Sequence, residues 1–74
     1  MMPYVDIKIT REGATAEQKA ELIAGVTDLL RRVLDKNPAT TVVTIDEVET
    51  ANWGLGGLPI LDYRAAQAAK ETQR

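Results

Sequence analysis

Residues 3–10 read Pro-Tyr-Val-Asp-Ile-Lys-Ile-Thr, a run in which apolar and polar side chains alternate. This period of two is typical of a strand with one buried face, because successive side chains point to opposite faces of a sheet. Proline is tolerated at the first strand position, where it withholds only one ladder donor. We therefore predict a strand from Pro3 to Thr10. Tyr4 and Lys8 are expected on its polar face, in contact with a neighbouring subunit.

The next part of the chain predicts one long helix. Residues 15–18 read Thr-Ala-Glu-Gln, the pattern of a capping box. Beyond them, apolar residues recur every three or four positions as far as Leu34, as in an amphipathic helix that packs one face on a sheet. The Asn-Pro pair at residues 37–38 is expected to end the helix. Gly25 indicates a close approach to another backbone, because glycine costs about 1 kcal/mol relative to alanine in a helix interior.

Residues 41–48 are rich in β-branched side chains and predict a second strand. A strand, a helix of about twenty residues and a strand with short connections make a right-handed βαβ unit with parallel strands, so the predicted fold class is α/β. A glycine-rich loop around Trp53 is expected at residues 49–57. Residues 58–61 are expected to form a short extended arm, and residues 62–72 a marginal helix or frayed tail.

Composition limits the classes of function. The 74 residues contain no cysteine and no histidine and carry a net charge of −2. A single domain of this size buries only roughly 60% of its unfolded surface, and without disulfides or a metal it is expected to form a homo-oligomer. The residue types predict no metal and no cofactor, and the scattered basic residues predict neither nucleic acid nor membrane as a partner. The chain lacks a run of eighteen apolar residues and a signal-peptide pattern, so a cytoplasmic protein is expected.

In order and spacing, the chain resembles the 4-oxalocrotonate tautomerase family in its first strand, its helix start, its second strand and the following Asn-Trp-Gly-Leu-Gly-Gly run (residues 3–9, 15–23, 45–48 and 52–57). The resemblance covers about residues 3–57 of one domain spanning residues 1–74, with residues 58–74 as a C-terminal arm or tail. It implies that two βαβ subunits form a four-stranded sheet with two helices on one face. It also implies a homohexamer made of three such dimers.

The resemblance implies a tautomerase, an isomerase that interconverts the enol and keto forms of a small α-keto acid. An amino-terminal proline is the general base and acid of that family, and Pro3 occupies its position. A terminal amine has a pKa of about 7.7–8.0, which an apolar site lowers, whereas the nitrogen of Pro3 behind Met2 is an amide without basicity. Methionine aminopeptidases remove methionine ahead of small residues, so the Met1-Met2 pair is expected to persist. Translation from Met2 would instead lead to an amino-terminal Pro3.

Two arginines of the family are replaced in this chain. The loop arginine falls at Ala14 and the strand arginine at Val42, which puts the dicarboxylic substrate of the family in doubt. Arg11 is predicted to bind a substrate carboxylate instead, because its fork of N–H groups matches that group, although a solvated loop charge is an equal alternative. Trp53 replaces a family phenylalanine and is predicted to line the substrate site as an apolar wall. If Trp53 is only an aromatic residue of the core or of a subunit interface, it has no role in substrate binding.

Two other functions stay open. A decarboxylase or dehalogenase of the same superfamily needs a carboxylate that activates water, for which Asp46 or Glu49 is available. Asp46 and Glu47 are adjacent on a predicted strand, so they face opposite sides and make a poor acid and base pair. The other alternative is a non-catalytic oligomer in which the acylated Pro3 does no chemistry.

Overall fold

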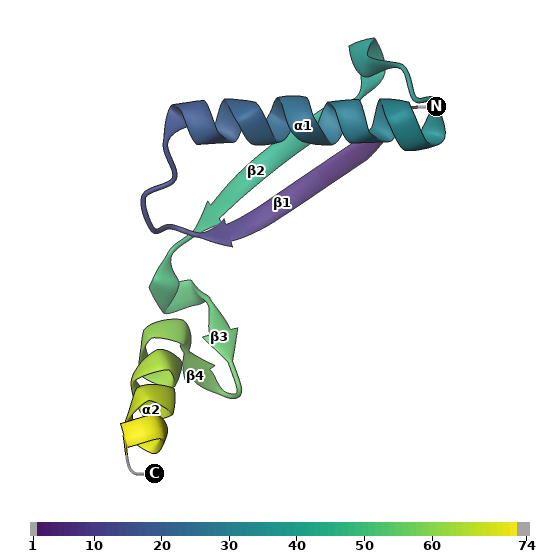
Figure 1. The fold of residues 1–74 in the computed structure, drawn as a ribbon. Coiled ribbons are helices and arrows are strands. Elements are labelled where there is room, and N and C mark those ends of the chain that lie inside the picture. The colour runs from purple at the N-terminus through teal and green to yellow at the C-terminus, as the bar shows by residue number, and fades with distance from the viewer. Residues whose placement is uncertain (1, 73–74) are drawn as a thin grey trace.

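The computed structural model describes residues 2–72 and confirms the βαβ unit (Figure 1). Strands β1 and β2 pair in parallel, and helix α1 lies across one face of the pair. A hairpin, β3 and β4, and a second helix, α2, follow β2 and project away from that unit. The elements in chain order are β1 (Tyr4–Thr10), α1 (Ala16–Leu34), η1 (Pro38–Thr40), β2 (Val42–Val48), η2 (Thr50–Asn52), β3 (Gly54–Leu55), β4 (Leu58–Pro59) and α2 (Ile60–Thr72).

The capping box that the sequence predicts fixes the start of α1. The hydroxyl of Thr15 accepts a hydrogen bond from the backbone N–H of Gln18 at 3.1 Å, and the Gln18 side chain accepts one from the Thr15 N–H at 2.9 Å. The helix ends at Leu34, before the predicted Asn-Pro stop. Asp35 adopts left-handed geometry with φ 55 and donates its N–H to Arg31 at 3.0 Å, which closes the last turn.

The register of β1 and β2 confirms the predicted alternation of faces. Tyr4 pairs with Val42 and Thr10 with Val48. The apolar residues of β1 are half-buried under α1, whereas Tyr4, Asp6 and Lys8 are exposed on the other face. Lys19 of α1 reaches Glu47 of β2 at 3.1 Å, so an ion pair fastens the helix to the inner face of the sheet.

The segment after β2 is more regular than the sequence predicts. The expected loop contains η2 and β3, and the expected extended arm is extended only over β4, because Ile60 opens α2. Gly56 and Gly57 have φ of 63 and 86 and form the two-residue turn between Leu55 and Leu58. Positive φ at both turn positions matches the right-handed twist of the two strands, and glycine adopts it without strain.

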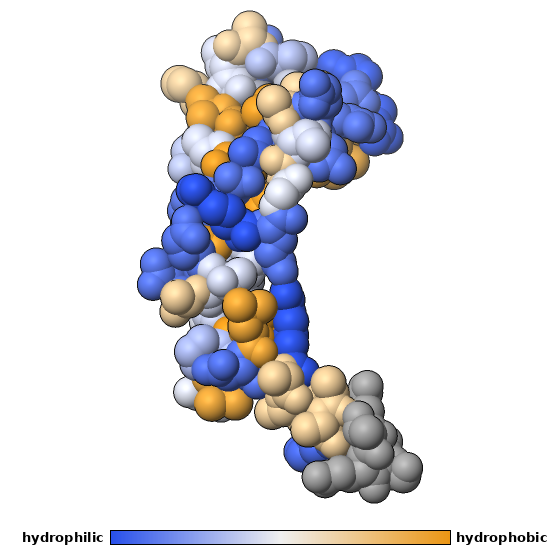
Figure 2. All heavy atoms as spheres, turned by 90° about the vertical axis from the view of Figure 1, so that its left-hand side faces the viewer, coloured by the Kyte–Doolittle hydropathy of each residue, from blue (hydrophilic) through white to orange (hydrophobic). Residues whose placement is uncertain are grey.

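One copy of the chain buries very little of itself. Among the described residues only Ile60 is buried, while Leu22 and Ile23 of α1 are each 41% exposed. Two strands about 5 Å apart are narrower than a helix about 10 Å across, so the sheet covers only part of the apolar stripe of α1. The radius of gyration is 17.0 Å, against about 11 Å for a compact domain of this length. Figure 2 shows hydrophobic side chains at the surface of the βαβ unit, in the upper part of the view. It also shows them on the segment below, made of β3, β4 and α2, which we call the arm.

Within residues 2–72, no helix is both long and apolar enough to cross a membrane.

Candidate active site

Pro3 lies at the edge of the sheet where both parallel strands begin. It is half-buried, and its carbonyl accepts a hydrogen bond from the backbone N–H of Val42 at 2.9 Å. The ladder therefore fixes the backbone of Pro3 at the amino edge of the sheet. Met2 precedes it, so in this chain the Pro3 nitrogen is a tertiary amide.

Val42, which stands where the resemblance implies the strand arginine, lies beside Pro3. Val42 is the first residue of β2, pairs with Tyr4 and is half-buried. An apolar side chain thus stands at the position where the resemblance implies an arginine. Ala14, at the place of the loop arginine, is half-buried in the connection between β1 and α1. Neither position supplies charge to a substrate.

Arg11 and Trp53 lie at the opposite end of the strands. Arg11 follows β1 directly and donates its N–H to the carbonyl of Val48 at 2.8 Å, and half-buried Trp53 follows η2. The seven residues of β1 separate Pro3 from Arg11, and these eight steps along the chain correspond to roughly 26 Å. One copy of the chain therefore does not bring Pro3 together with Arg11. The binding roles of Arg11 and Trp53 stay predictions.

Two groups of polar side chains lie at this carboxyl edge of the sheet, the pair Arg11–Glu49 and the triad Thr10–Glu12–Arg64, and we call them together the carboxyl-edge cluster. The Arg11 Nε lies 3.1 Å from a Glu49 carboxylate oxygen. Arg64 of α2 donates to both carboxylate oxygens of Glu12, at 2.5 and 3.2 Å, and the Thr10 hydroxyl donates to the same carboxylate. The Arg64 guanidinium, followed by the Thr10 hydroxyl, lowers the pKa of Glu12 to about 2. The cluster therefore links the arm to the βαβ unit with charged groups.

Sequence reasoning singled out only Arg11 and Glu49 from this cluster. The Glu12 and Arg64 pair spans 52 residues, and no pattern in either segment points to the other. Only the path of the chain through β2 and the hairpin brings α2 beside the loop after β1.

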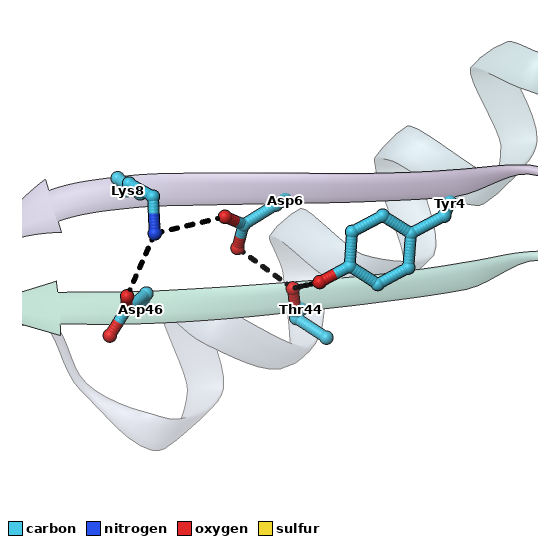
Figure 3. A network of polar contacts seen from close by, with 5 residues as sticks. All are labelled: Tyr4, Asp6, Lys8, Thr44 and Asp46. Atoms are coloured by element: carbon cyan, nitrogen blue, oxygen red, sulfur yellow. Dashed lines mark hydrogen bonds and ion pairs between the residues drawn. The ribbon is translucent and has the colours of Figure 1, made fainter.

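A second polar network covers the sheet face opposite α1 (Figure 3). The Lys8 ammonium lies 3.1 Å from Asp6 and 3.0 Å from Asp46, and Asp6 accepts a hydrogen bond of 2.8 Å from Thr44. The Tyr4 hydroxyl lies 3.2 Å from the Thr44 hydroxyl. Hydrogen bonds from Thr44 and then Lys8 lower the pKa of Asp6, and the two carboxylates raise the pKa of Lys8. Asp6 and Lys8 therefore keep their charges at neutral pH.

The two carboxylates considered for water activation are both engaged and both distant from Pro3 in one copy. Asp46 pairs with Lys8 four residues beyond Val42, about 13 Å along the strand, and Glu49 pairs with Arg11 farther on. Within residues 2–72, no group of acidic side chains is arranged to hold a metal ion.

This chain is similar in sequence and in structure to several known proteins. A family model described as tautomerase enzyme matches residues 3–63. A probable tautomerase K2 of Dickeya dadantii is 65% identical over 63 residues, covering 85% of this chain and 94% of that protein. The crystal structure of DmpI from Helicobacter pylori superposes with a TM-score of 0.79 at 49% identity, over 85% of this chain and 97% of that one. A heterohexamer 4-oxalocrotonate tautomerase from Chloroflexus aurantiacus superposes with a TM-score of 0.74 at 30% identity, over 82% and 97%.

Proposed function

The chain belongs to the tautomerase family, and on that premise we propose that it isomerises a small α-keto acid between its enol and keto forms with Pro3 as the base. The observation that carries this proposal is the position of Pro3. The family match begins at this residue, and a ladder hydrogen bond of 2.9 Å to Val42 holds its backbone at the amino edge of the sheet. The proposal applies to a chain whose first residue is Pro3.

The chemistry follows from the amine of such a chain. A secondary amine beside half-buried Val42 is partly desolvated, which disfavours its ammonium form and lowers its pKa towards neutrality. The free amine removes a proton from the carbon next to the keto group and becomes an ammonium. The electron pair of the broken C–H bond forms the carbon–carbon double bond, and the carbonyl oxygen takes a proton from solvent water. In the reverse direction the ammonium returns the proton to carbon. No cofactor takes part.

We propose that the complete site lies between copies of the chain. Arg11, which would bind the substrate carboxylate, and Trp53, which would form an apolar wall, lie at the carboxyl edge, whereas Pro3 lies at the amino edge. Contacts between copies could join the two edges, and the scarcity of buried residues in one copy supports such contacts. We propose a homohexamer as the assembly, and the six subunits of a similar heterohexamer support the number of copies.

Two forms of the protein test the role of Pro3. One form retains Met1 and Met2, and the other begins at Pro3, with both masses verified. The probe is an aryl-substituted pyruvate, whose enol absorbs in the ultraviolet and is lost on ketonisation. The form beginning at Pro3 is expected to ketonise it about 10²–10⁴-fold faster than the longer form, because general acid–base catalysis has that magnitude. Pro3→Ala in the shorter form should lose part of the gain, since a primary amine remains.

Equal turnover by the two forms would mean that Pro3 is not the base. Equal inactivity, with correct folding and assembly, would favour the non-catalytic oligomer instead. An active longer form would direct attention to carboxylate chemistry, and Glu49→Gln would then be the variant to measure.

A further inference from the structure

The arginine side chains between residues 2 and 72 differ in how their N–H donors are used. In this range, the guanidinium groups of Arg31, Arg32 and Arg64 each donate hydrogen bonds to a carboxylate. The Nε of Arg11 lies 3.1 Å from a Glu49 carboxylate oxygen, but its guanidinium donates no hydrogen bond to a residue of the same range. The donors of Arg11 are therefore open to a ligand, and a pair of them matches the two oxygens of a carboxylate.

The pairing of Arg11 with Glu49 follows from the parallel register of the sheet. Thr10 and Val48 are the last partners of β1 and β2, and Arg11 and Glu49 are the next residues along the two segments. The Arg11 N–H donates to the Val48 carbonyl at 2.8 Å, which holds the two backbones together at this point. The two side chains therefore start from neighbouring backbone positions, as in a cross-strand pair.

The carboxylate of Glu49 is not engaged by the short helix that it precedes. Glu49 is the N-cap residue of η2, a position at which side-chain oxygens commonly accept a hydrogen bond, but its side chain forms no such cap. The N–H of Asn52 bonds instead to the backbone carbonyl of Glu49, at 2.8 Å. The Glu49 carboxylate thus pairs with Arg11 and not with the helix.

The helix η2 connects this ion pair to Trp53. Glu49 precedes η2 and half-buried Trp53 follows it, and the Trp53 N–H donates to the Thr50 carbonyl at 3.2 Å. Four steps with a rise of about 2 Å each separate Glu49 from Trp53 along the helix axis by roughly 8 Å. The two side chains proposed to bind substrate, Arg11 and Trp53, are therefore tied to opposite ends of one short helix.

The exposure of the pair decides where its effect falls. Arg11 is 57% and Glu49 59% exposed, so water screens the pair and its contribution to folding is small. A bidentate contact with a small acid requires the guanidinium at a fixed place, and an arginine side chain loses much rotamer freedom when it is fixed. A carboxylate that already restrains Arg11 reduces this loss on binding. The pair therefore acts on ligand binding more than on stability.

We infer that Glu49 is a positioning residue, which holds the Arg11 guanidinium at the carboxyl edge so that its open N–H groups receive the carboxylate of a small keto acid. Glu49 itself neither touches the substrate nor takes a proton. The inference rests on the proposed function for the binding of an acid at Arg11, but not for the role of Pro3 as the base. A simple charge effect predicts the opposite result, because a carboxylate beside the site repels an anionic ligand and its removal tightens binding.

Binding of benzoylformate separates the two effects. This aryl α-keto acid has no C–H bond next to its keto group, so it is not converted and its Kd reports binding alone. Glu49→Gln is expected to raise the Kd about three- to fivefold in both forms of the protein, and Arg11→Ala about tenfold or more. Glu12→Gln is the matched control, because it removes the same charge at the same edge from the pair with Arg64, and it should not raise the Kd.

Side-chain NMR tests the positioning of Arg11 without a ligand. The order parameter of its Nε–H bond should fall in Glu49→Gln and keep the parental value in Glu12→Gln. In the Arg11→Ala background, Glu49→Gln should leave the Kd within about twofold, because a positioning residue has no effect without the group that it positions.

An unchanged or lower Kd in Glu49→Gln, or an equal rise in Glu12→Gln, would overturn the inference. An unchanged order parameter of Arg11 in Glu49→Gln would also overturn it. If the form beginning at Pro3 fails to ketonise its probe, the proposed chemistry is wrong, but the Kd and the order parameter still decide the role of Glu49.

Discussion

Removal of the Thr15 hydroxyl tests whether the capping box carries the stability of α1, the element that covers the sheet. Thr15→Ala deletes the acceptor of the Gln18 N–H, which lies 3.1 Å from the hydroxyl oxygen, and leaves that donor to water. The reciprocal bond of 2.9 Å from the Thr15 N–H to the Gln18 side chain survives, because it uses backbone atoms of Thr15. We therefore expect a loss of about 1 kcal/mol in the free energy of unfolding, within the usual range of about 0.5–2 for helix caps.

The assay is urea unfolding followed by circular dichroism, with every variant at the same protein concentration, since association shifts apparent stability. The loss corresponds to a fall in melting temperature of about 4–8 °C for a chain of this size. Thr15→Ser should keep parental stability. Thr27→Ala removes the same atoms in mid-helix, where the hydroxyl donates to the Ile23 carbonyl at 2.7 Å, and should change stability by less than about 0.5 kcal/mol. Equal losses in Thr15→Ala and Thr27→Ala would refute the reasoning.

Two further predictions concern the carboxyl-edge cluster. The pKa of Glu12 is lowered from 4.5 to about 2, so its contribution to stability is complete above about pH 4.5 and is lost as the pH falls towards 2. A carboxyl NMR titration should show this value in the parent chain and a higher pKa in Arg64→Ala; an unchanged value in that variant would contradict the prediction. In the chain that begins at Pro3, Arg11→Ala should raise KM for an acidic substrate more than it lowers kcat, because an anchoring contact is made equally in the ground and transition states. An unchanged KM would remove Arg11 from the substrate site.

The regular elements of the βαβ unit could be predicted from short stretches of sequence. The alternation from Pro3 to Thr10 and the Thr15 capping box correspond to β1 and to the start of α1. Such patterns suffice because strand and helix periods involve residues that are close in the chain. The hairpin at Gly56 and Gly57 was missed although its signal was present, since two glycines between strand-forming residues are typical of a two-residue turn.

The tertiary structure alone decided which functional side chains can meet. The sequence by itself identified Pro3 and Arg11 as candidates, but their separation to opposite edges of the sheet follows from the parallel register of β1 with β2. Likewise, the ion pair between Glu12 and Arg64 depends on the path of the chain through β2, the β3–β4 hairpin and α2. The physical reason is that a local pattern sets backbone conformation through neighbouring residues, whereas a contact across 52 residues depends on every turn between them. Gly25 illustrates both sources of information. Its cost to helix stability is evident from the sequence. The open space beside it is evident only from the structure.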